Sequence, residues 1–433
     1  MSDIFQTAEL KVPLQQDFLP IVLSYIEEAS TVFKMSRQDA TQLVLATEEI
    51  FSFLVYNAKR ADILYLAATT KGSCMEVTAK FASEMLPVQA MNLTTKIAAD
   101  DDSALGSMGL LIAARSVDSL SLSIDNDGYM HLNYTKNKQY NKISPIDCPV
   151  THFSGDYVAE DIDASKIPLF CAHALAEYGA SDADEFLRYP QKLNDIITKG
   201  NFDGCFAVDS QGQVAGALFW EANGEMINGK GFFIFAKDDK EKVAKVLMNG
   251  CQNRTFILQP HCLFLEHATL DTPLDFLRLG RTAAYLPMYA GDKPATIYIN
   301  SDLVPYAKDF YRKIGVIRNI YEQMPGNAIS SIPSENSAFA ISIDKVYKEV
   351  KISTLWIGKD AVENLHNHIN VLRAEGMASL IFDLAIEKPE DAIMSSFLLQ
   401  VGFKPEVIIP WTKDGDILRF VYDLNIHTDN TTA

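Results

Sequence analysis

The 433-residue sequence lacks any apolar run long enough to cross a membrane. Its apolar stretches, such as Ile50–Val55 and Met108–Ala114, fall well short of the roughly 20 residues that a membrane-spanning helix needs. The first ten residues, MSDIFQTAEL, contain neither a basic stretch nor an apolar one, so we expect no secretory signal. The sequence therefore predicts a protein that does not span a membrane.

Cysteine and histidine are scarce and scattered. The 6 cysteines form no CxxC pair, and the 8 histidines follow no zinc-binding spacing. His366 and His368 are two residues apart, which places them on different faces of a helix. We predict reduced thiols, a cytoplasmic location and no metal site.

Basic residues are outnumbered throughout the chain. There are 38 Lys and Arg against 56 Asp and Glu, which gives a formal net charge of -18. An acidic surface repels both a phosphate backbone and an anionic membrane, so we predict no nucleic-acid partner and no membrane partner. The 48% hydrophobic content is typical of a folded protein, and the length favours two or three domains.

Residues 1–140 show the pattern of a two-layer α/β sandwich. Hydrophobic spacing predicts two helices, two strands, a third helix and a closing hairpin with the turn Asn126-Asp127-Gly128. In chain order these predicted elements are strand 8–12, helices 17–33 and 36–58, strands 62–69 and 74–81, helix 106–116, and strands 119–125 and 129–135.

The proline-containing stretch 136–150 is predicted to be a linker, and strands and helices alternate after it. The pattern restarts near residue 290, so we predict domains 151–290 and 291–433 and an α/β (α+β) fold class. The expected elements are helices 162–178 and 190–199, strands 203–208, 213–219 and 231–236, helix 240–249, strand 262–268, strand 296–299, helix 303–315, strands 338–342 and 351–356, helix 361–375, strand 379–384, helix 391–401, and strand pairs to residue 424.

The run Leu43–Glu49 followed by the helix start Gly106–Ile112 resembles the GHKL ATPase fold, in the version found in anti-sigma-factor serine kinases. The resemblance covers nearly all of residues 5–137. It implies that carboxylates orient the attacking group and that glycines let backbone N–H groups approach the phosphates. The nucleotide-binding residues that it implies, if binding is retained, are Glu48, Glu49, Gly106, Ser107 and Gly109.

Two elements of the GHKL pattern are missing. The asparagine that holds Mg²⁺ should fall four residues after Glu49, where this chain has Phe53. The Asp-x-Gly turn that recognises adenine should follow strand 74–81, but residues 82–87 read Ala-Ser-Glu-Met-Leu-Pro. Because Phe cannot coordinate a hard cation, the resemblance implies a retained fold that does not use ATP and Mg²⁺.

Residues 155–425 resemble the GNAT acetyltransferase fold, as fused behind such ATPase-like domains in some bacterial proteins. The motifs that carry the resemblance are Tyr178-Gly179, Tyr189-Pro190-x-x-Leu193, Phe206–Asp209, Gly212–Gly216, Asp383–Ala385, Leu399-x-x-Gly402-Phe403, Ile409–Trp411 and Gly415-Asp416-x-Leu418-Arg419. Two GNAT-like halves in one chain would form a pseudo-dimer.

The resemblance also locates a cofactor loop. An acetyltransferase binds the pyrophosphate of acetyl-CoA on a glycine-containing loop between strand 231–236 and helix 240–249. Here that loop reads Lys237-Asp238-Asp239, and its two carboxylates repel a pyrophosphate. The equivalent stretch 358–361 also departs from the pattern. If acetyl-CoA is bound, Ile234, Phe235 and Lys237 are the predicted contacts.

Glu266, at the end of strand 262–268, is the residue best placed for a general base. The neighbouring His267 would point to the opposite face, and a plain surface charge is the alternative for Glu266. We expect Trp220, Trp356 and Trp411 to be core or interface aromatics. Cys205 and Cys262 are expected to be core residues.

Three functional hypotheses follow. The favoured one is a cytoplasmic bacterial regulatory or interaction protein with a protein partner, in which both enzyme-like regions have lost catalysis and no cofactor is used. The alternative is an N-acetyltransferase that uses acetyl-CoA. The second alternative is an ATP-dependent serine kinase of a partner-switching system, which the missing motifs disfavour more strongly. The sequence does not predict the oligomeric state.

Overall fold

The computed structural model describes residues 6–57, 62–82, 109–110, 112–124, 127, 129–148, 152–179, 185–200, 202–289, 294–323, 335–344 and 348–425. It has the predicted mixed α/β (α+β) class, with three large sheets and one two-stranded sheet. Within the described part of the chain, none of the helices has both the length and the apolar character needed to cross a membrane.

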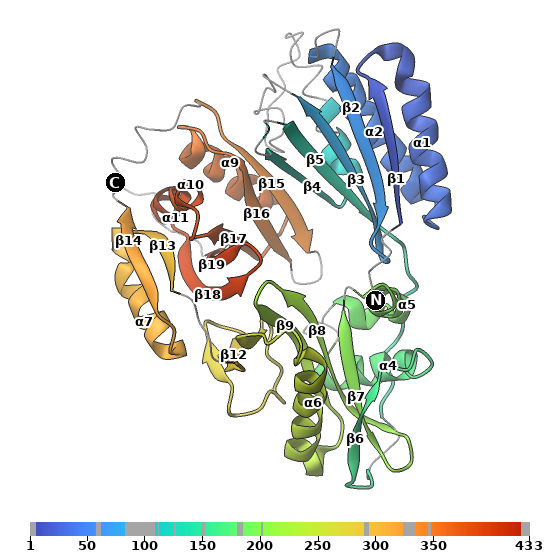
Figure 1. The fold of residues 1–433 in the computed structure, drawn as a ribbon, viewed down its shortest axis with the longest axis vertical. Coiled ribbons are helices and arrows are strands. Elements are labelled where there is room, and N and C mark those ends of the chain that lie inside the picture. Colours follow the sequence, from blue (N-terminus) through green and yellow to red (C-terminus); the bar gives the residue numbers. More distant parts are fainter. Residues whose placement is uncertain are drawn as a thin grey trace.

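The N-terminal sheet is antiparallel, with strand order β1-β2-β3-β5-β4, and helices α1 and α2 cover one of its faces (Figure 1). Alternate residues of its strands are buried, as expected for a sheet with one covered face. Its elements are β1 (Thr7–Pro13), η1 (Gln16–Phe18), α1 (Leu19–Val32), α2 (Arg37–Asn57), β2 (Ile63–Thr70), β3 (Cys74–Ala82), β4 (Ser119–Ile124) and β5 (Tyr129–Asn137).

The second sheet has the order β11-β12-β10-β9-β8-β7-β6, in which β9 and β10 are parallel and all other neighbours antiparallel. Helices α4 and α5 share a hydrophobic core with one face, and α6 shares a core with the other. The elements are β6 (Tyr157–Asp161), α4 (Ile167–Tyr178), η3 (Glu185–Arg188), α5 (Pro190–Thr198), β7 (Asp203–Asp209), β8 (Val214–Asn223), β9 (Met226–Ile234), η4 (Lys237–Asp239), α6 (Lys240–Thr255), β10 (Cys262–Leu265), β11 (Leu277–Leu279) and β12 (Ala283–Pro287).

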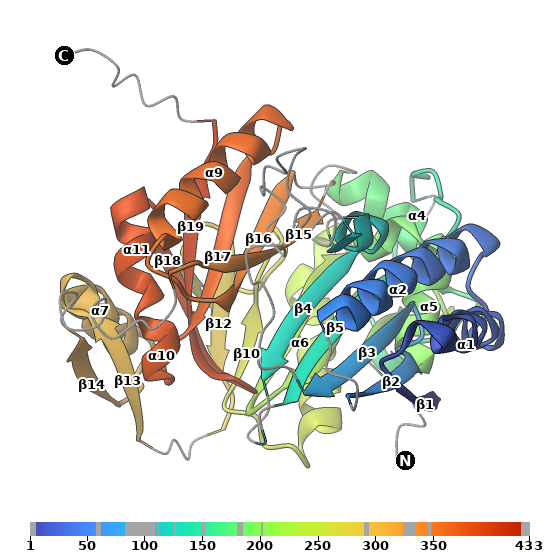
Figure 2. The same cartoon turned by 90° about the horizontal axis from the view of Figure 1, so that it is seen from above.

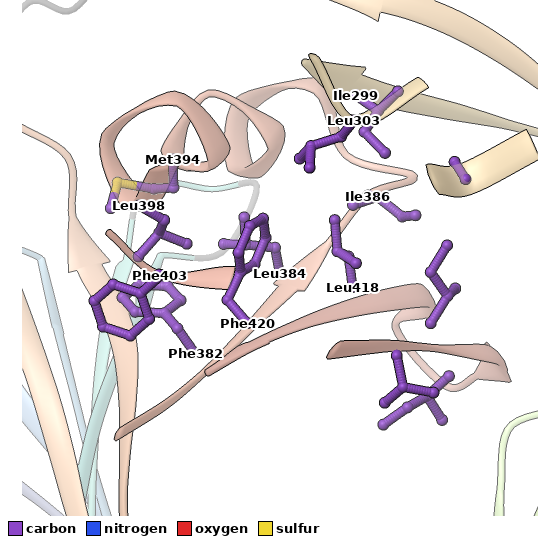
Figure 3. Packing of buried hydrophobic residues seen from close by; sticks show 14 of the residues in the cluster. Ile299, Leu303, Phe382, Leu384, Ile386, Met394, Leu398, Phe403, Leu418 and Phe420 are labelled. Atoms are coloured by element: carbon purple, nitrogen blue, oxygen red, sulfur yellow. The ribbon is translucent and has the colours of Figure 1, made fainter. Parts of the chain in front are cut away.

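The third sheet has the order β15-β16-β17-β19-β18, with a parallel pair β16–β17, and β13 and β14 form a separate parallel pair beside it. Figure 3 shows Phe382 and Phe420 of this sheet packed near Leu398 and Met394 of α11. The elements are β13 (Ala295–Asn300), η5 (Ser301–Leu303), α7 (Val304–Ile314), β14 (Arg318–Gln323), β15 (Ala338–Asp344), β16 (Glu349–Trp356), α9 (Ala361–Ala374), β17 (Ser379–Ala385), α10 (Pro389–Ala392), α11 (Met394–Val401), β18 (Lys404–Thr412) and β19 (Gly415–Asp423).

Strands β8 to β12 of the second sheet have the same order as β15 to β19 of the third sheet. Each contains a parallel pair joined by a helix, β9-α6-β10 in one and β16-α9-β17 in the other. In each, the last strand then inserts between the second parallel strand and the strand that precedes it in the chain, as β12 does beside β10 and β19 beside β17. This repetition supports two related halves, although the predicted boundaries 151–290 and 291–433 stay a prediction.

The two halves meet where two hairpin turns interlock. In the β8–β9 turn, the Glu225 amide donates to the Trp411 carbonyl at 2.9 Å. The Lys413 amide of the β18–β19 turn donates to Asn223 Oδ1 at 3.1 Å. Gly224 lies between them with a φ of +69°, and a Cβ there would lie 2.6 Å from the Trp411 oxygen. Figures 1 and 2 both show β18 beside the strands of the second sheet.

The N-terminal sheet packs against the third sheet through its edge. Strand β4 contacts β15 and β16, and the three lie side by side in both views (Figure 2). Ala338 of β15 is fully buried in the core of the N-terminal unit, and Trp356 of β16 packs against the same core. Trp220 and Trp411 are also buried, so the prediction of core or interface roles for the tryptophans is confirmed.

Helix signals placed most elements correctly. The Ser36 hydroxyl accepts a hydrogen bond from the Asp39 amide at 3.1 Å, so Ser36 caps α2, at the predicted start of this helix. The sequence reading missed β6, β11, β12 and β14, and it began β9 five residues too late. Those segments are short or flank glycine-containing stretches, so their period-two pattern is too brief to detect.

We predict that Gly224→Ala destabilises the protein by about 1–3 kcal/mol more than Gly212→Ala. Both glycines have a positive φ, but a Cβ at Gly224 would collide with the backbone of the opposite turn, whereas a Cβ at Gly212 would have nothing within 4 Å. Denaturant midpoints of the two variants measure the difference. Equal losses would show that the turns do not interlock as described.

Candidate functional site

A gap opens in the second sheet where β9 and β10 stop pairing. These parallel strands pair only over Met226–Gly229 and Cys262–Leu265. Strand β9 continues to Ile234 without β10, paired with β8 on its other side. The predicted acetyl-CoA contacts Ile234, Phe235 and Lys237 lie at this end of β9 or just after it. A ligand in this gap would need the backbone polar groups that β9 no longer shares with β10.

Those backbone groups are already satisfied by side chains of the protein itself. The Ile234 amide donates to the Tyr178 hydroxyl at 2.6 Å, and that hydroxyl donates to Asp271 Oδ2 at 2.5 Å. The Thr269 hydroxyl donates to the Phe232 carbonyl at 2.8 Å. Burial and the Asp271 carboxylate raise the pKa of Tyr178 well above its usual value, so its hydroxyl stays protonated. Side chains of the protein therefore fill the hydrogen-bonding positions of this gap.

The residues predicted to contact acetyl-CoA follow the same pattern. Ile234 and Phe235 are buried in the cores on either side of the sheet. Lys237 begins the short helix η4, where its ammonium forms an ion pair with Glu177. Lys240 forms an ion pair with Asp271. The three predicted residues lie close together in the chain. The two apolar side chains are packed in hydrophobic cores, and the Lys237 ammonium is paired with Glu177.

The equivalent end of the third sheet is covered by a strap, residues Glu335–Ser337. The Asp360 amide, at the start of α9, donates to the Glu335 carbonyl at 3.2 Å, and the Ser337 amide donates to Asp360 Oδ1 at 2.5 Å. A Cβ at Gly358 would overlap the backbone of Asn336. The strap therefore occupies the helix entry at which a cofactor phosphate would bind.

A cavity of about 520 Å³ lies between the second and third sheets. Like β9 and β10, the parallel strands β16 and β17 stop pairing partway, after Ile352 and Phe382, and both continue along the cavity wall. The lining residues are Asn223, Met226, Asn228, Phe264 and Glu266 from one half and Lys351, Ser353, Thr354, Asp383, Leu384, Ala385, Lys388, Asp391, Ile409, Thr412, Lys413, Asp414, Ile417 and Arg419 from the other.

An ion-pair network centred on Arg419 spans this cavity. The guanidinium donates from Nε to Asp383 Oδ1 at 2.7 Å and from Nη2 to Asp383 Oδ2 at 2.9 Å. Its remaining Nη1 donates to Glu266 of the other half. Lys351 lies 2.7 Å from Asp383, and Lys230 lies 3.6 Å from Glu266. Two carboxylates are therefore shared by three cations across the junction of the halves.

This network sets the protonation state of Glu266. Burial raises the pKa of Glu266, but Arg419 and Lys230 outweigh it and hold the pKa well below its usual range. A carboxylate stabilised in this way is a weak proton acceptor at neutral pH. The catalytic role of Glu266 stays a prediction, and its geometry is that of a residue joining the two halves.

The N-terminal residues predicted to bind a nucleotide are only partly brought together. Glu48 and Glu49 are half-buried on α2, and a Cβ at Gly109 would lie 2.6 Å from Glu49 Oε2. Gly106 and Ser107 lie outside the described residues. Phe53, at the position of the expected magnesium ligand, is 4% exposed and belongs to the core of this unit.

The cysteines are unpaired, and the burial of two of them was predicted from the sequence. All six cysteines are free, and Cys205 and Cys262 are fully buried, as predicted for core residues. Across the described residues, no group of three or more His, Cys, Asp or Glu side chains is placed to hold a metal ion.

Comparison with known proteins gives a distant structural similarity. No family model matches the chain, and no curated protein sequence matches it. Among solved structures, the chain is similar to an aminoglycoside 6'-N-acetyltransferase complexed with coenzyme A. The two share 10% identity over 63% of this chain and 99% of that chain, with a TM-score of 0.24. A similarity this distant establishes no activity, and the GHKL resemblance stays a prediction.

The sequence analysis missed Tyr178, Thr269, Asp383 and Arg419 as interacting residues, although three of the four stand in or beside its GNAT motifs. Tyr178 was noted as part of the Tyr178-Gly179 motif and as the end of a helix, without an interaction partner. Arg419 and Asp383 are 36 positions apart in the chain, and pairing of β17 with β19 places them side by side. Spacing alone gives no sign of such a pair.

We predict that the Arg419 network weakens on acidification. Burial raises the pKa of Asp383, but Arg419 and Lys351 outweigh it and hold that pKa below its usual range. Its contribution to stability is therefore complete above the unfolded-state pKa of about 3.9 and disappears as the pH falls below it. The difference in Tm between the wild type and Asp383→Asn should be largest at pH 7 and shrink toward pH 3.

The control is Asp414→Asn, which changes an exposed carboxylate on the rim of the same cavity. Its Tm difference from the wild type should stay small at every pH. A difference for Asp383→Asn that does not vary between pH 7 and pH 3 would contradict the description of the network.

Proposed function

We propose that the chain is a regulatory or interaction protein in which acetyltransferase-like halves serve as binding surfaces and no acetyl transfer takes place. The observation that carries this proposal is the internal pairing of β9: the Ile234 amide and the Phe232 carbonyl bond to Tyr178 and Thr269. A cofactor could reach these groups only by breaking those hydrogen bonds and displacing both side chains.

Charge at the helix entries supports the same conclusion. Asp238 and Asp239 precede α6, and a pyrophosphate at this position would be repelled by both carboxylates. In the other half, the Glu335–Ser337 strap uses the Asp360 amide. The bacterial origin, the cytoplasmic location and the protein partner belong to this proposal as well, on the strength of the sequence resemblances and the acidic charge.

The N-terminal unit fits a binding role in the same way. The position that should supply the magnesium ligand holds Phe53, which is packed in the core. An apolar side chain supplies no ligand for a hard cation, so this unit lacks a group that phosphoryl transfer requires. We therefore place the serine kinase last among the three hypotheses.

N-acetyltransferase is the second candidate function, and the cavity between the halves favours it. Strands β16 and β17 diverge along the cavity, and Thr354 and Leu384 of their separated ends line it. A volume of about 520 Å³ is within the usual range for a ligand pocket. An acetyltransferase would have to bind its cofactor through these strands alone.

Calorimetric titration of the full-length protein with acetyl-CoA and with Mg-ATP tests the proposal. We expect that neither ligand binds more tightly than the millimolar range and that neither raises Tm by more than about 1 °C. Micromolar binding of acetyl-CoA would support the second candidate and overturn the first.

Two variants identify the half that is responsible if acetyl-CoA does bind. Lys237→Asp adds a carboxylate at the entry of α6, and Ser353→Phe narrows the cavity beside β16. Both positions are at least partly exposed, so the variants should keep the fold. Loss of binding in one variant alone would assign the site to its half.

A further inference from the structure

A second cavity, of about 470 Å³, lies between the N-terminal unit and the first of the two C-terminal halves. It has no part in the proposed function. Its walls come from the start of α2, the end of β5, the segment that follows β5, and the start of α5. The lining residues are Gln38, Asp39, Gln42, Asp118, Lys136, Asn137, Lys138, Gln139, Tyr140, Tyr189 and Lys192.

Three of these lining residues are lysines, in a chain whose net charge is -18. Lys136 and Lys138 lie at the end of β5 and directly after it, and Lys192 of α5 lines the same cavity. Lys142 adds a fourth positive charge nearby, 5.9 Å from the centre of the Tyr189 ring. Such a concentration of positive charge on an acidic protein attracts anions to one place.

The carboxylates of the wall are occupied. Asp39 is buried and accepts hydrogen bonds from Ser36 and Gln139. Asp118 accepts from Lys136 at 3.2 Å and from the Asn137 amide at 2.7 Å. Neither carboxylate is paired with Lys138, and among the described residues Lys138 has no ion pair within 4 Å.

The surroundings of Lys138 leave its charge poorly compensated. Burial lowers the pKa of Lys138; Asp195 opposes this effect, and the nearby ammonium groups of Lys199 and Lys34 add to it. Asp195 itself accepts a hydrogen bond from the Tyr140 hydroxyl at 2.8 Å. An anion beside Lys138 would add to the favourable interaction that Asp195 supplies and offset the repulsion from Lys199 and Lys34.

We propose that this cavity binds a small phosphate-bearing anion, held by the ammonium groups of Lys138 and Lys192. Gln38 and Gln42 supply amide donors for further phosphate oxygens, and the rings of Tyr140 and Tyr189 limit the size of the group. An open cavity of this size can admit a small molecule such as pyrophosphate or a phosphate monoester. Nucleic acid is disfavoured because the chain as a whole carries a formal net charge of -18.

Binding at this cavity would also strengthen a junction. The β2–β3 turn already packs on α5, where a Cβ at Gly72 would lie 2.9 Å from the Asp195 carbonyl oxygen. The Lys138 amide donates to the Ser73 carbonyl at 2.9 Å. Because the lysines of the site belong to the N-terminal unit, the segment after it and α5, an anion that bridges them would hold these three parts together.

Titration of the full-length protein with pyrophosphate and with inorganic phosphate, at constant ionic strength, tests this proposal. The wild type should bind pyrophosphate more tightly than phosphate, and Lys138→Ala should weaken pyrophosphate binding by about tenfold or more, as expected for loss of a charge-assisted contact. Lys138→Arg should retain most of the affinity. Lys245→Ala, at an exposed position of α6, is the matched control and should bind like the wild type.

Three outcomes would overturn the proposal. One is that the wild type does not bind pyrophosphate at a concentration of about 10 mM, because a specific site should have a dissociation constant below that concentration. Another is equal loss in Lys138→Ala and Lys245→Ala, which would indicate a general charge effect. The third is unchanged binding in Lys138→Ala with a circular dichroism spectrum like that of the wild type.

Discussion

The buried carboxylate of Asp416 is the interaction on which the arrangement of the C-terminal region depends. Its two oxygens accept hydrogen bonds from Arg318 at 2.7 and 3.2 Å, and the side chains of this pair are 0% and 1% exposed. The Tyr311 hydroxyl donates to Asp416 at 2.6 Å, and so does the Trp411 amide at 2.9 Å. A charge buried so completely is tolerated only when its hydrogen bonds are satisfied.

This network reaches the junction between the halves. Trp411 has a φ of +58°, a conformation that costs a bulky residue roughly 1–3 kcal/mol and persists only when its surroundings enforce it. The hydrogen bond from its amide to Asp416 helps to hold that conformation, and its carbonyl then accepts from the Glu225 amide of the other half. Arg318 and Tyr311 attach β14 and α7 to the same point, so one carboxylate organises four segments.

Docking of the halves in turn creates the large cavity and its charges. Glu266 belongs to one half, and Asp383 and Arg419 belong to the other, so the network exists only when the halves are joined. Internal hydrogen bonds also occupy the predicted cofactor positions. Tyr178, Thr269 and the Glu335–Ser337 strap bond to backbone amide and carbonyl groups that a ligand would otherwise use. Glu266, which the sequence predicts as a general base, is paired with Arg419 of the other half.

The sequence by itself determined the fold class and most elements, because hydrophobic period and helix caps act over a few residues: Ser36 begins α2, and the 119–135 hairpin forms as its turn predicts. It also placed Phe53 where the GHKL resemblance predicts a Mg²⁺ ligand, and two aspartates before α6. Only the tertiary structure decided that Tyr178 closes the β9 edge, that Glu266 joins Arg419, and that lysines gather around Lys138. Each of these contacts joins residues that are far apart in the chain and that strand pairing and packing bring together. A local sequence pattern does not predict such contacts.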